Sequence, residues 1–271
     1  MITSVRNEHI RAIAELRETK VRRDRGQILI EGAREIARAT QRQVSLVEIV
    51  FCADFLNANS RELLEILRQT NIAATEVAAH VFEKIALRER VDGIVAVAKR
   101  PDTSLAKLTA SLSAGGTTTP CWIAVEAVEK PGNLGAIIRS TDGAGTSAVV
   151  VLDPAVDVFS PNVIRASIGA CFHATVVECT ADDLLQLARK HNMQILGAAL
   201  SPTAVDYSKV DMRPPTLILL GSEAHGLSPF WLESCDQLIC LPMRGIGDSL
   251  NVSVTAGILA YEVSRQRQPR G

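Results

Sequence analysis

The 271-residue sequence lacks a long hydrophobic run. None of its apolar stretches approaches the ~18–20 residues that span a bilayer. The N-terminus, MITSVRNEHIR, also lacks the apolar core of a signal peptide. With 47% hydrophobic and 22% charged residues, the composition is that of an ordinary globular protein. We therefore expect a protein that stays in the cytoplasm, and its length allows two domains.

Metal-binding and disulfide patterns are also missing. The six cysteines contain no C-x-x-C pair, and the five histidines show no H-x-x-x-H spacing. Several cysteines stand in apolar, strand-like runs, which predicts reduced, buried thiols and no zinc site. We expect no metal. The G-x-G-x-x-G fingerprint and the ribose-binding acid of a nicotinamide dehydrogenase are absent too, which argues against that class of enzyme.

The net charge of −1 predicts no polyanionic partner by itself, but the charge is unevenly distributed. Residues 1–117 hold 18 Lys and Arg against 15 Asp and Glu, whereas residues 118–271 hold 11 against 15. The run RETKVRRDR carries five basic residues, which are Arg17, Lys20, Arg22, Arg23 and Arg25. These are the candidate RNA-binding residues, since a basic N-terminal module suggests contact with a polyanion. The alternative is that the run is only a solvated helix face.

Helical and strand-like segments alternate along the chain. The first domain, residues 1–98, is predicted to contain strands at 28–30, 46–51, 73–77 and 93–98, and helices at 4–18, 33–41 and 81–87, with a further helix capped by Ser60. Residues 99–119 contain Pro, Gly and a triple threonine, and we interpret them as a linker with a short helix at 104–112.

Residues 120–271 show a more regular alternation. Strands are expected at 121–126, 148–152, 174–178, 194–199, 216–220 and 238–241. Helices are expected at 134–144 and 251–265, and after the caps Ser160, Thr180 and Ser228. Because each strand is apolar throughout, the pattern predicts a parallel sheet with helices on both faces, and hence an α/β fold.

Three stretches that follow strands could carry chemistry. The first, 129–139, is a Gly- and Pro-containing turn with Arg139 on the first turns of a helix. The second, 219–227, is a glycine-flanked acidic loop in which His225 is a possible base, although a lone loop histidine is usually incidental. The third, 238–259, is a glycine-rich loop that ends in a helix start, whose unpaired N–H groups can bind polar ligand atoms. Its apolar strand is predicted to lie in the middle of the sheet.

The three stretches read N-L-G-x-x-x-R, L-G-S-E-x-x-G-L, and L-P-M followed by S-L-N-V-S. In this order, the sequence resembles the SpoU/TrmH family of RNA ribose 2′-O-methyltransferases, within the SPOUT superfamily. The first half, with ITSVRNEHIRAI, ILIEGAREI and VDGIVAVA, also looks like the small substrate-binding domain of the family, which is similar to RNA-binding ribosomal proteins.

The resemblance implies a deep trefoil knot in the C-terminal domain, an obligate homodimer, and S-adenosylmethionine as methyl donor. It places Gly221, Leu241, Met243, Leu250 and Ser253 at the donor-binding positions. It places at the catalytic centre Asn133, Arg139, Glu223, Ser249 and Asn251.

Arg139 is the strongest of the catalytic candidates that the resemblance implies. Since a guanidinium has a pKa above ~12, we expect it to clamp a neighbouring phosphate and stabilise a developing alkoxide, although the family also suggests a role as base. Asn133 and Glu223 are expected to orient groups around it. Ser222 departs from the family, in which many members carry Asn, so its role is left open.

The resemblance does not identify which RNA is the substrate. The N-terminal domain favours ribosomal RNA, of the large subunit, over transfer RNA or a ribosomal site that confers antibiotic resistance. From another class, a non-catalytic RNA-binding dimer is the alternative, against which the Asn133, Arg139, Glu223 and Asn251 set argues. The target nucleotide and any need for a protein partner are not evident from the sequence.

Overall fold

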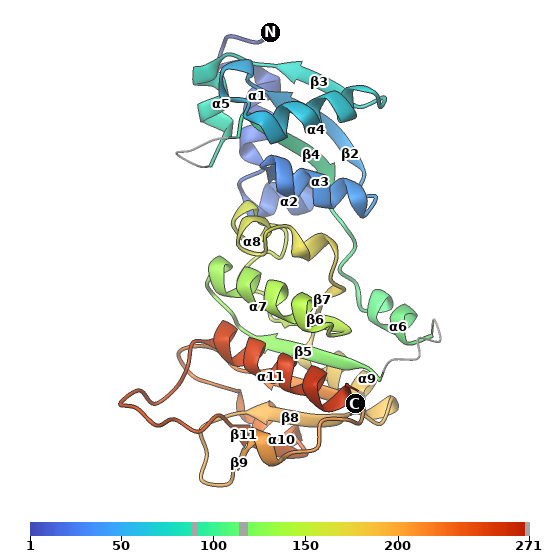
Figure 1. Ribbon diagram of the computed structural model, residues 1–271, viewed down its shortest axis with the longest axis vertical. Coiled ribbons are helices and arrows are strands. Elements are labelled where there is room, and N and C mark those ends of the chain that lie inside the picture. Colours follow the sequence, from blue (N-terminus) through green and yellow to red (C-terminus); the bar gives the residue numbers. More distant parts are fainter. Residues whose placement is uncertain (88–91, 114–118, 269–271) are drawn as a thin grey trace. The chain divides into compact units, whose positions relative to one another are not determined.

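The computed structural model describes residues 1–87, 92–113 and 119–268. The chain forms two compact units (Figure 1). The first unit contains Met1–Pro101 together with Asp157–His173. The second contains Asp102–Val156 and Ala174–Gly271. Residues 157–173 therefore group with the N-terminal residues, although the sequence prediction assigns them to the 120–271 domain.

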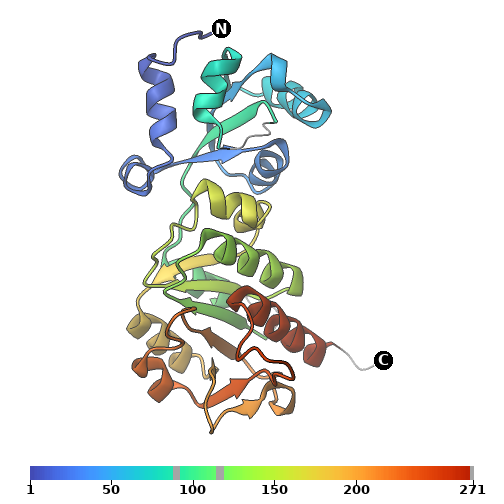
Figure 2. The ribbon, with the colours of Figure 1, turned by 90° about the vertical axis from the view of Figure 1, so that its left-hand side faces the viewer.

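The first unit is built on a four-stranded mixed sheet in the order β1-β4-β2-β3. The strands are β1 (Gln27–Glu31), β2 (Leu46–Phe51), β3 (Ala73–Glu76) and β4 (Ile94–Lys99). β4 is antiparallel to β1 and β2, whereas β3 is parallel to β2. Side chains of α1 (Glu8–Glu15) and α5 (Ala79–Ile85) pack in one apolar cluster with alternate strand residues. Figure 2 shows α3 (Ala33–Gln41) and α4 (Ala58–Arg68) on the other face.

Residues 157–173 complete the first unit with α8 (Pro161–Ala166) and the short 3-10 helix η2 (Ala170–Phe172). α8 contacts β1, and η2 contacts α3. The segment begins at Asp157, which is buried and accepts hydrogen bonds from Arg22 Nε and Arg100 Nη1, both at 2.6 Å. Burial alone would raise the pKa of Asp157, but Arg100 and Arg22 together hold it below its ordinary value. The segment is thus anchored by a buried ion triad.

The second unit contains a seven-stranded parallel sheet in the order β7-β6-β5-β10-β8-β11-β9. Its strands are β5 (Cys121–Glu126), β6 (Ala148–Leu152), β7 (Val176–Cys179), β8 (Gln194–Ala198), β9 (Val205–Asp206), β10 (Thr216–Leu220) and β11 (Gln237–Cys240). The prediction of a parallel sheet is confirmed. Three of these strands, β5, β10 and β11, end at the stretches that the sequence singled out.

Helices cover both faces of this sheet. α7 (Pro131–Ala144) and α11 (Val252–Arg267) lie side by side on one face (Figures 1 and 2). Side chains of α6 (Leu105–Ser113), α9 (Ala181–Lys190) and α10 (Pro229–Ser234) pack in the cluster on the other face, around Trp122 and Trp231. The arrangement places the starts of α7 and α11, which carry two of the three stretches, next to each other.

Four local predictions were wrong. Strand β11 is second from the edge of the sheet, with only the two-residue β9 outside it, and not in the middle. The helix predicted at 4–18 spans only Glu8–Glu15, because Asn7 caps it and a second helix, α2 (Thr19–Arg25), follows. Asn57 caps α4, with Ser60 as the reciprocal partner in a capping box. α7 begins at Pro131, so Asn133 lies in its first turn.

Among the described helices, none is both long and apolar enough to cross a bilayer. The described residues also contain no group of three or more His, Cys, Asp or Glu side chains arranged to hold a metal ion. All six cysteines are free thiols, of which three are buried (Cys52, Cys121 and Cys171) and three are half-buried (Cys179, Cys235 and Cys240).

Candidate active site

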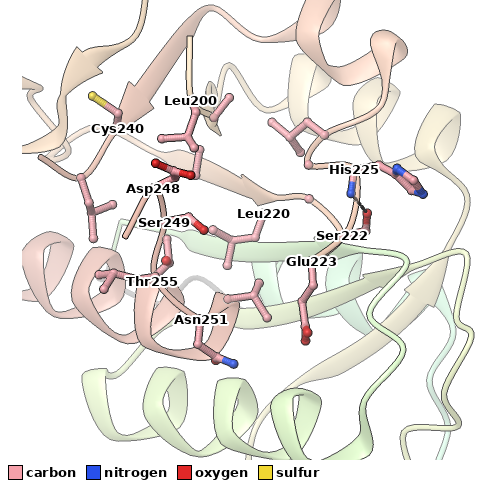
Figure 3. Close-up of a pocket in the computed structure, with 18 of the residues that line it drawn as sticks. Leu200, Leu220, Ser222, Glu223, His225, Cys240, Asp248, Ser249, Asn251 and Thr255 are labelled. Carbon is pink, nitrogen blue, oxygen red and sulfur yellow. Dashed lines mark hydrogen bonds between the residues drawn. The ribbon is translucent and has the colours of Figure 1, made fainter. Parts of the chain in front are cut away.

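A pocket of about 610 Å³ opens at the carboxyl ends of β8, β10 and β11 (Figure 3). Its wall is formed by the loops after these strands and by the start of α11. The wall combines polar residues with aliphatic side chains, among them Leu200, Leu220, Ile239, Leu241, Met243 and Leu250. Pockets of this size and polarity at the carboxyl edge of a parallel sheet are typical ligand-binding sites.

Gly221 lies in the pocket wall, where β10 ends, and shapes the loop that follows. A Cβ atom at this position would lie 2.0 Å from the carbonyl carbon of Gly226. The loop folds back on itself through backbone hydrogen bonds in both directions between Ser222 and Gly226. The close approach of the loop's own backbone therefore requires glycine at position 221.

A hydrogen-bond network joins the three stretches at the rim of the pocket. Glu223, after β10, accepts hydrogen bonds from Lys130 Nζ at 2.5 Å and from Asn133 Nδ2. Asn133 Oδ1 in turn accepts a hydrogen bond from Asn251 Nδ2 at 3.3 Å. Asn251 also caps α11, because its Oδ1 accepts hydrogen bonds from the backbone N and the Oγ of Ser253. Segments 118 residues apart are thus held together by side chains.

The carboxylate of Glu223 is the charged centre of this network. Figure 3 shows that Glu223 and Asn251 both point toward α7, which carries Asn133. The hydrogen bond from Lys130 lowers the pKa of Glu223 more than its partial burial raises it, and Asn133 adds to the lowering. The same hydrogen bond raises the pKa of Lys130. At neutral pH the pair is therefore ionised on both sides.

The comparison with protein families assigns the two halves of the chain. Residues 120–261 match the SpoU rRNA methylase family, and residues 7–96 match the MRM3-like substrate-binding domain. The first match covers more than half of the chain. The chain belongs to the SpoU rRNA methylase family. It is accordingly an RNA ribose 2′-O-methyltransferase that uses S-adenosylmethionine.

Relatives match over nearly the whole length. The 23S rRNA (uridine(2479)-2′-O)-methyltransferase of Streptomyces viridochromogenes is 30% identical over 249 residues, which cover 89% of this chain and 84% of the relative. A crystal structure of an RNA 2′-O ribose methyltransferase is 35% identical, with a TM-score of 0.82 and 98% coverage of both chains. The structure of AviRb from Streptomyces viridochromogenes in complex with the cofactor AdoMet is 26% identical, with a TM-score of 0.84 and coverage of 96% and 99%.

The pocket fits the donor of this methylase family. Its volume of about 610 Å³ lies within the range of small-molecule sites, roughly 300–1,000 Å³. Its aliphatic wall suits an adenine ring, while the polar residues Ser222, Ser249 and Thr255 line it as well. Of the donor-binding candidates, Gly221, Leu241, Met243 and Leu250 line the pocket, whereas Ser253 contacts it only through Asn251.

The catalytic candidates of the methylase divide into two groups. Glu223, Ser249 and Asn251 line the pocket, and Asn133 reaches it through its hydrogen bonds to Glu223 and Asn251. Arg139 is not among the residues that line it. Since α7 begins at Pro131, Arg139 lies in the third turn of this helix and not in its first turns, and its side chain is exposed.

The basic run of the methylase forms α2 and the residues before it, but its members differ in exposure. Arg22 is 1% exposed, and its guanidinium donates to Asp157, to the carbonyl oxygens of Leu16 and Arg17, and to Thr19. The interpretation of Arg22 as an RNA-binding residue is therefore wrong, because its donors are already satisfied inside the protein.

The other four basic residues are more accessible. Arg17 is half-buried and donates to the carbonyl oxygens of Lys84 and Ala86. Arg25 is exposed and pairs with Glu15 at 2.6 Å. Lys20 and Arg23 are exposed on α2. Lys20, Arg23 and Arg25 thus remain the surface cations of this run.

Sequence reasoning missed two polar residues of the site. Lys130 forms an ion pair with Glu223 in the network, and Asp248 lines the pocket from the loop before α11. Both are charged residues in loops, where no periodicity indicates which way a side chain points. The signal that could have identified Lys130 and Asp248 as site residues is their position directly beside two of the recognised motifs. His225 lines the pocket as well, but its backbone N donates to Ser222 Oγ at 3.1 Å, so its contribution to the loop's structure is through its main chain.

Proposed function

We propose that the protein methylates a ribose 2′-hydroxyl of ribosomal RNA, with the large subunit as the favoured source. The observation that carries the proposal is the network of Glu223, Asn133 and Asn251 at the rim of the donor-sized pocket. The 23S rRNA specificity of the Streptomyces viridochromogenes relative supports the choice of RNA. In this proposal residues 1–98 bind the RNA, residues 99–119 form the linker, and residues 120–271 hold the donor and the catalytic groups.

The reaction is an in-line displacement at the donor's methyl carbon, and it requires alignment of the ribose oxygen and loss of its proton. The bound donor supplies an electrophilic methyl group. Gly221, Leu241, Met243 and Leu250 hold it in the pocket, with Ser249 beside them. Asn133, kept in place by Glu223 and Asn251, orients the groups around the incoming ribose.

Arg139 clamps the phosphate next to the target ribose and stabilises the developing alkoxide. A planar guanidinium suits a phosphate because it can donate two parallel hydrogen bonds. The protein acts as a homodimer, in which Arg139 reaches the reaction centre from one of the two subunits. Exposed apolar side chains on α11, Val254 and Tyr261, support a partner at this helix. We also propose the trefoil knot of the SPOUT fold for the C-terminal domain.

Arg139→Lys tests the clamp. The substitution keeps the charge but loses the bidentate fork, so we expect methylation to fall by about tenfold or more. Donor affinity, measured by calorimetry, should stay unchanged, because Arg139 does not line the pocket of its own chain. Near-normal methylation by the variant would contradict the clamp.

The RNA is tested with donor labelled in its methyl group. Purified protein is incubated separately with large-subunit ribosomal RNA, small-subunit ribosomal RNA and transfer RNA, and the product is hydrolysed with alkali. A ribose 2′-O-methyl group blocks cleavage, so label in alkali-resistant dinucleotides from the large-subunit RNA is the expected result. Label from transfer RNA alone would assign the same reaction to another substrate. RNA binding without donor binding or label would favour the non-catalytic RNA-binding dimer.

A further inference from the structure

The charges that line the pocket are of one sign. Two carboxylates, Glu223 and Asp248, belong to the wall, and the described residues that line it include no lysine or arginine. Figure 3 shows the two carboxylates well apart, on loops that follow different strands. The pocket thus presents negative charge at two separate places.

The two carboxylates differ in what compensates them. Glu223 is paired with Lys130 at 2.5 Å and also accepts a hydrogen bond from Asn133. Asp248 lies in the exposed loop before α11, and within the described residues no lysine, arginine or amide is paired with it. Arg244, the cation of the same loop, interacts electrostatically with Asp206. Asp248 is therefore the carboxylate whose charge remains available to a ligand in the pocket.

The donor and its demethylated product differ in charge by one unit. S-adenosylmethionine carries a sulfonium and an ammonium against one carboxylate, whereas S-adenosylhomocysteine carries a neutral thioether in place of the sulfonium. A carboxylate that faces the pocket attracts the first more strongly than the second. Specificity between two ligands is the difference between their binding free energies, and one uncompensated charge is enough to create such a difference.

We propose that Asp248 is a specificity-determining residue that makes the pocket prefer the cationic donor over its neutral product. This inference rests on the proposed function, because it takes the pocket as the donor site. Its role is electrostatic: it stabilises the charged donor, so that the donor competes more effectively with the product for the pocket after each methyl transfer. Asp248 takes no part in moving the proton of the ribose.

The test is calorimetric titration of S-adenosylmethionine and of S-adenosylhomocysteine into the wild type and into Asp248→Asn. We expect the Kd for S-adenosylmethionine to rise by about fivefold in the variant, as is typical of one solvated charge pair, and that for S-adenosylhomocysteine to change by less than about twofold. Asp248→Glu should retain the preference. Asp211→Asn is the matched control, because Asp211 is an exposed carboxylate of the same unit, paired with Arg213 and absent from the pocket wall.

Salt provides a second readout. Raising the ionic strength should weaken the binding of S-adenosylmethionine to the wild type and should affect Asp248→Asn less. Equal weakening of both ligands by Asp248→Asn, or no change in either, would overturn the proposal while leaving the donor site intact. If the wild type binds neither ligand, the proposed function itself fails. These results are therefore distinguishable.

Discussion

Asp157 and Glu223 are both carboxylates held by two side-chain nitrogen donors, but they serve different purposes. The Asp157 side chain has no exposed surface, and its partners Arg22 and Arg100 are 1% and 13% exposed. The Glu223 side chain is 30% exposed, and that of Lys130 is 70% exposed. The first cluster joins segments of the first unit, whereas the second stands at the rim of a pocket in the second unit.

The exposure of the side chains distinguishes a structural ion pair from a functional one. In the buried cluster the guanidinium of Arg22 donates to four oxygen atoms of the protein, and Asp157 also accepts a hydrogen bond from the backbone N of Phe159. In the exposed cluster, Lys130 and Glu223 keep surface that an incoming ligand can reach. Burial makes a charged group costly to disturb, and exposure leaves it free for chemistry.

Replacing Asp157 should give the largest effect. Asp157→Ala leaves Arg22 buried without its counter-charge, and loss of one partner of such a pair costs about 3–5 kcal/mol of unfolding free energy. Denaturant titration followed by circular dichroism measures the loss. Asp211→Ala, which removes an exposed pair with Arg213, should leave stability nearly unchanged. Equal effects of the two substitutions would remove the distinction between buried and exposed clusters.

The same cluster predicts a pH dependence. Because Arg100 and Arg22 hold the pKa of Asp157 below its ordinary value of 3.8, its contribution to stability is present above that value. The contribution is lost as the pH falls through the lowered pKa of the folded state. The difference in unfolding free energy between wild type and Asp157→Ala should therefore shrink when the pH is lowered from about 5 toward 3. A constant difference over this range would contradict the ionised triad.

An intermediate effect is expected from a substitution at Gly221, because it changes the shape of the pocket loop and not the charge of the site. The added Cβ of Gly221→Ala would lie 2.0 Å from Gly226, so the loop that carries Glu223 has to move. Such crowding typically costs about 1–3 kcal/mol, and donor affinity should fall by about tenfold. Gly245→Ala is the control, because its Cβ meets no atom within 4 Å. Unchanged donor binding in Gly221→Ala would show that the loop's position is unimportant to the pocket.

Local signals in the sequence predicted much of the fold. Strands β2, β5, β6 and β10 have the predicted bounds. Two predicted caps are confirmed, since Ser160 Oγ and Thr180 Oγ1 accept hydrogen bonds from the backbone N of Val163 and Asp183. These features depend on residues within one or two turns of each other, so a short stretch of sequence contains the information.

Long-range pairing could not be predicted in this way. Arg22 and Asp157 are 135 residues apart, and nothing in the basic run marks one of its five cations as buried. The apolar run of β11 indicates that the strand is buried but not which strand lies beside it. For this reason the sequence wrongly predicts β11 in the middle of the sheet, whereas it is second from the edge. The convergence of the three motif stretches was different, because carboxyl ends of parallel strands share one edge. Hydrogen bonds between Asn133, Glu223 and Asn251 are consistent with that expectation.

Replacing Lys130 should change stability least but should reduce methylation. Its side chain is 70% exposed, so Lys130→Gln should leave the free energy of unfolding nearly unchanged. Glu223 would keep its hydrogen bond from Asn133 but lose its counter-charge, and methylation should fall by about twofold to fivefold. Lys190→Gln, which removes an exposed lysine at the end of α9, is the matched control and should retain full activity.

The pH–rate profile decides whether Lys130 acts through Glu223. Because Lys130 lowers the pKa of Glu223, removing it should let that pKa rise. A network that requires the ionised carboxylate then fails at a higher pH, so the acidic limb of the profile should shift upward in Lys130→Gln, whereas Lys130→Arg should preserve it. A uniform loss of activity with an unmoved acidic limb would instead make Lys130 a simple contact to RNA. In that case Lys130 would not act through Glu223, and Asn133 alone would hold the carboxylate.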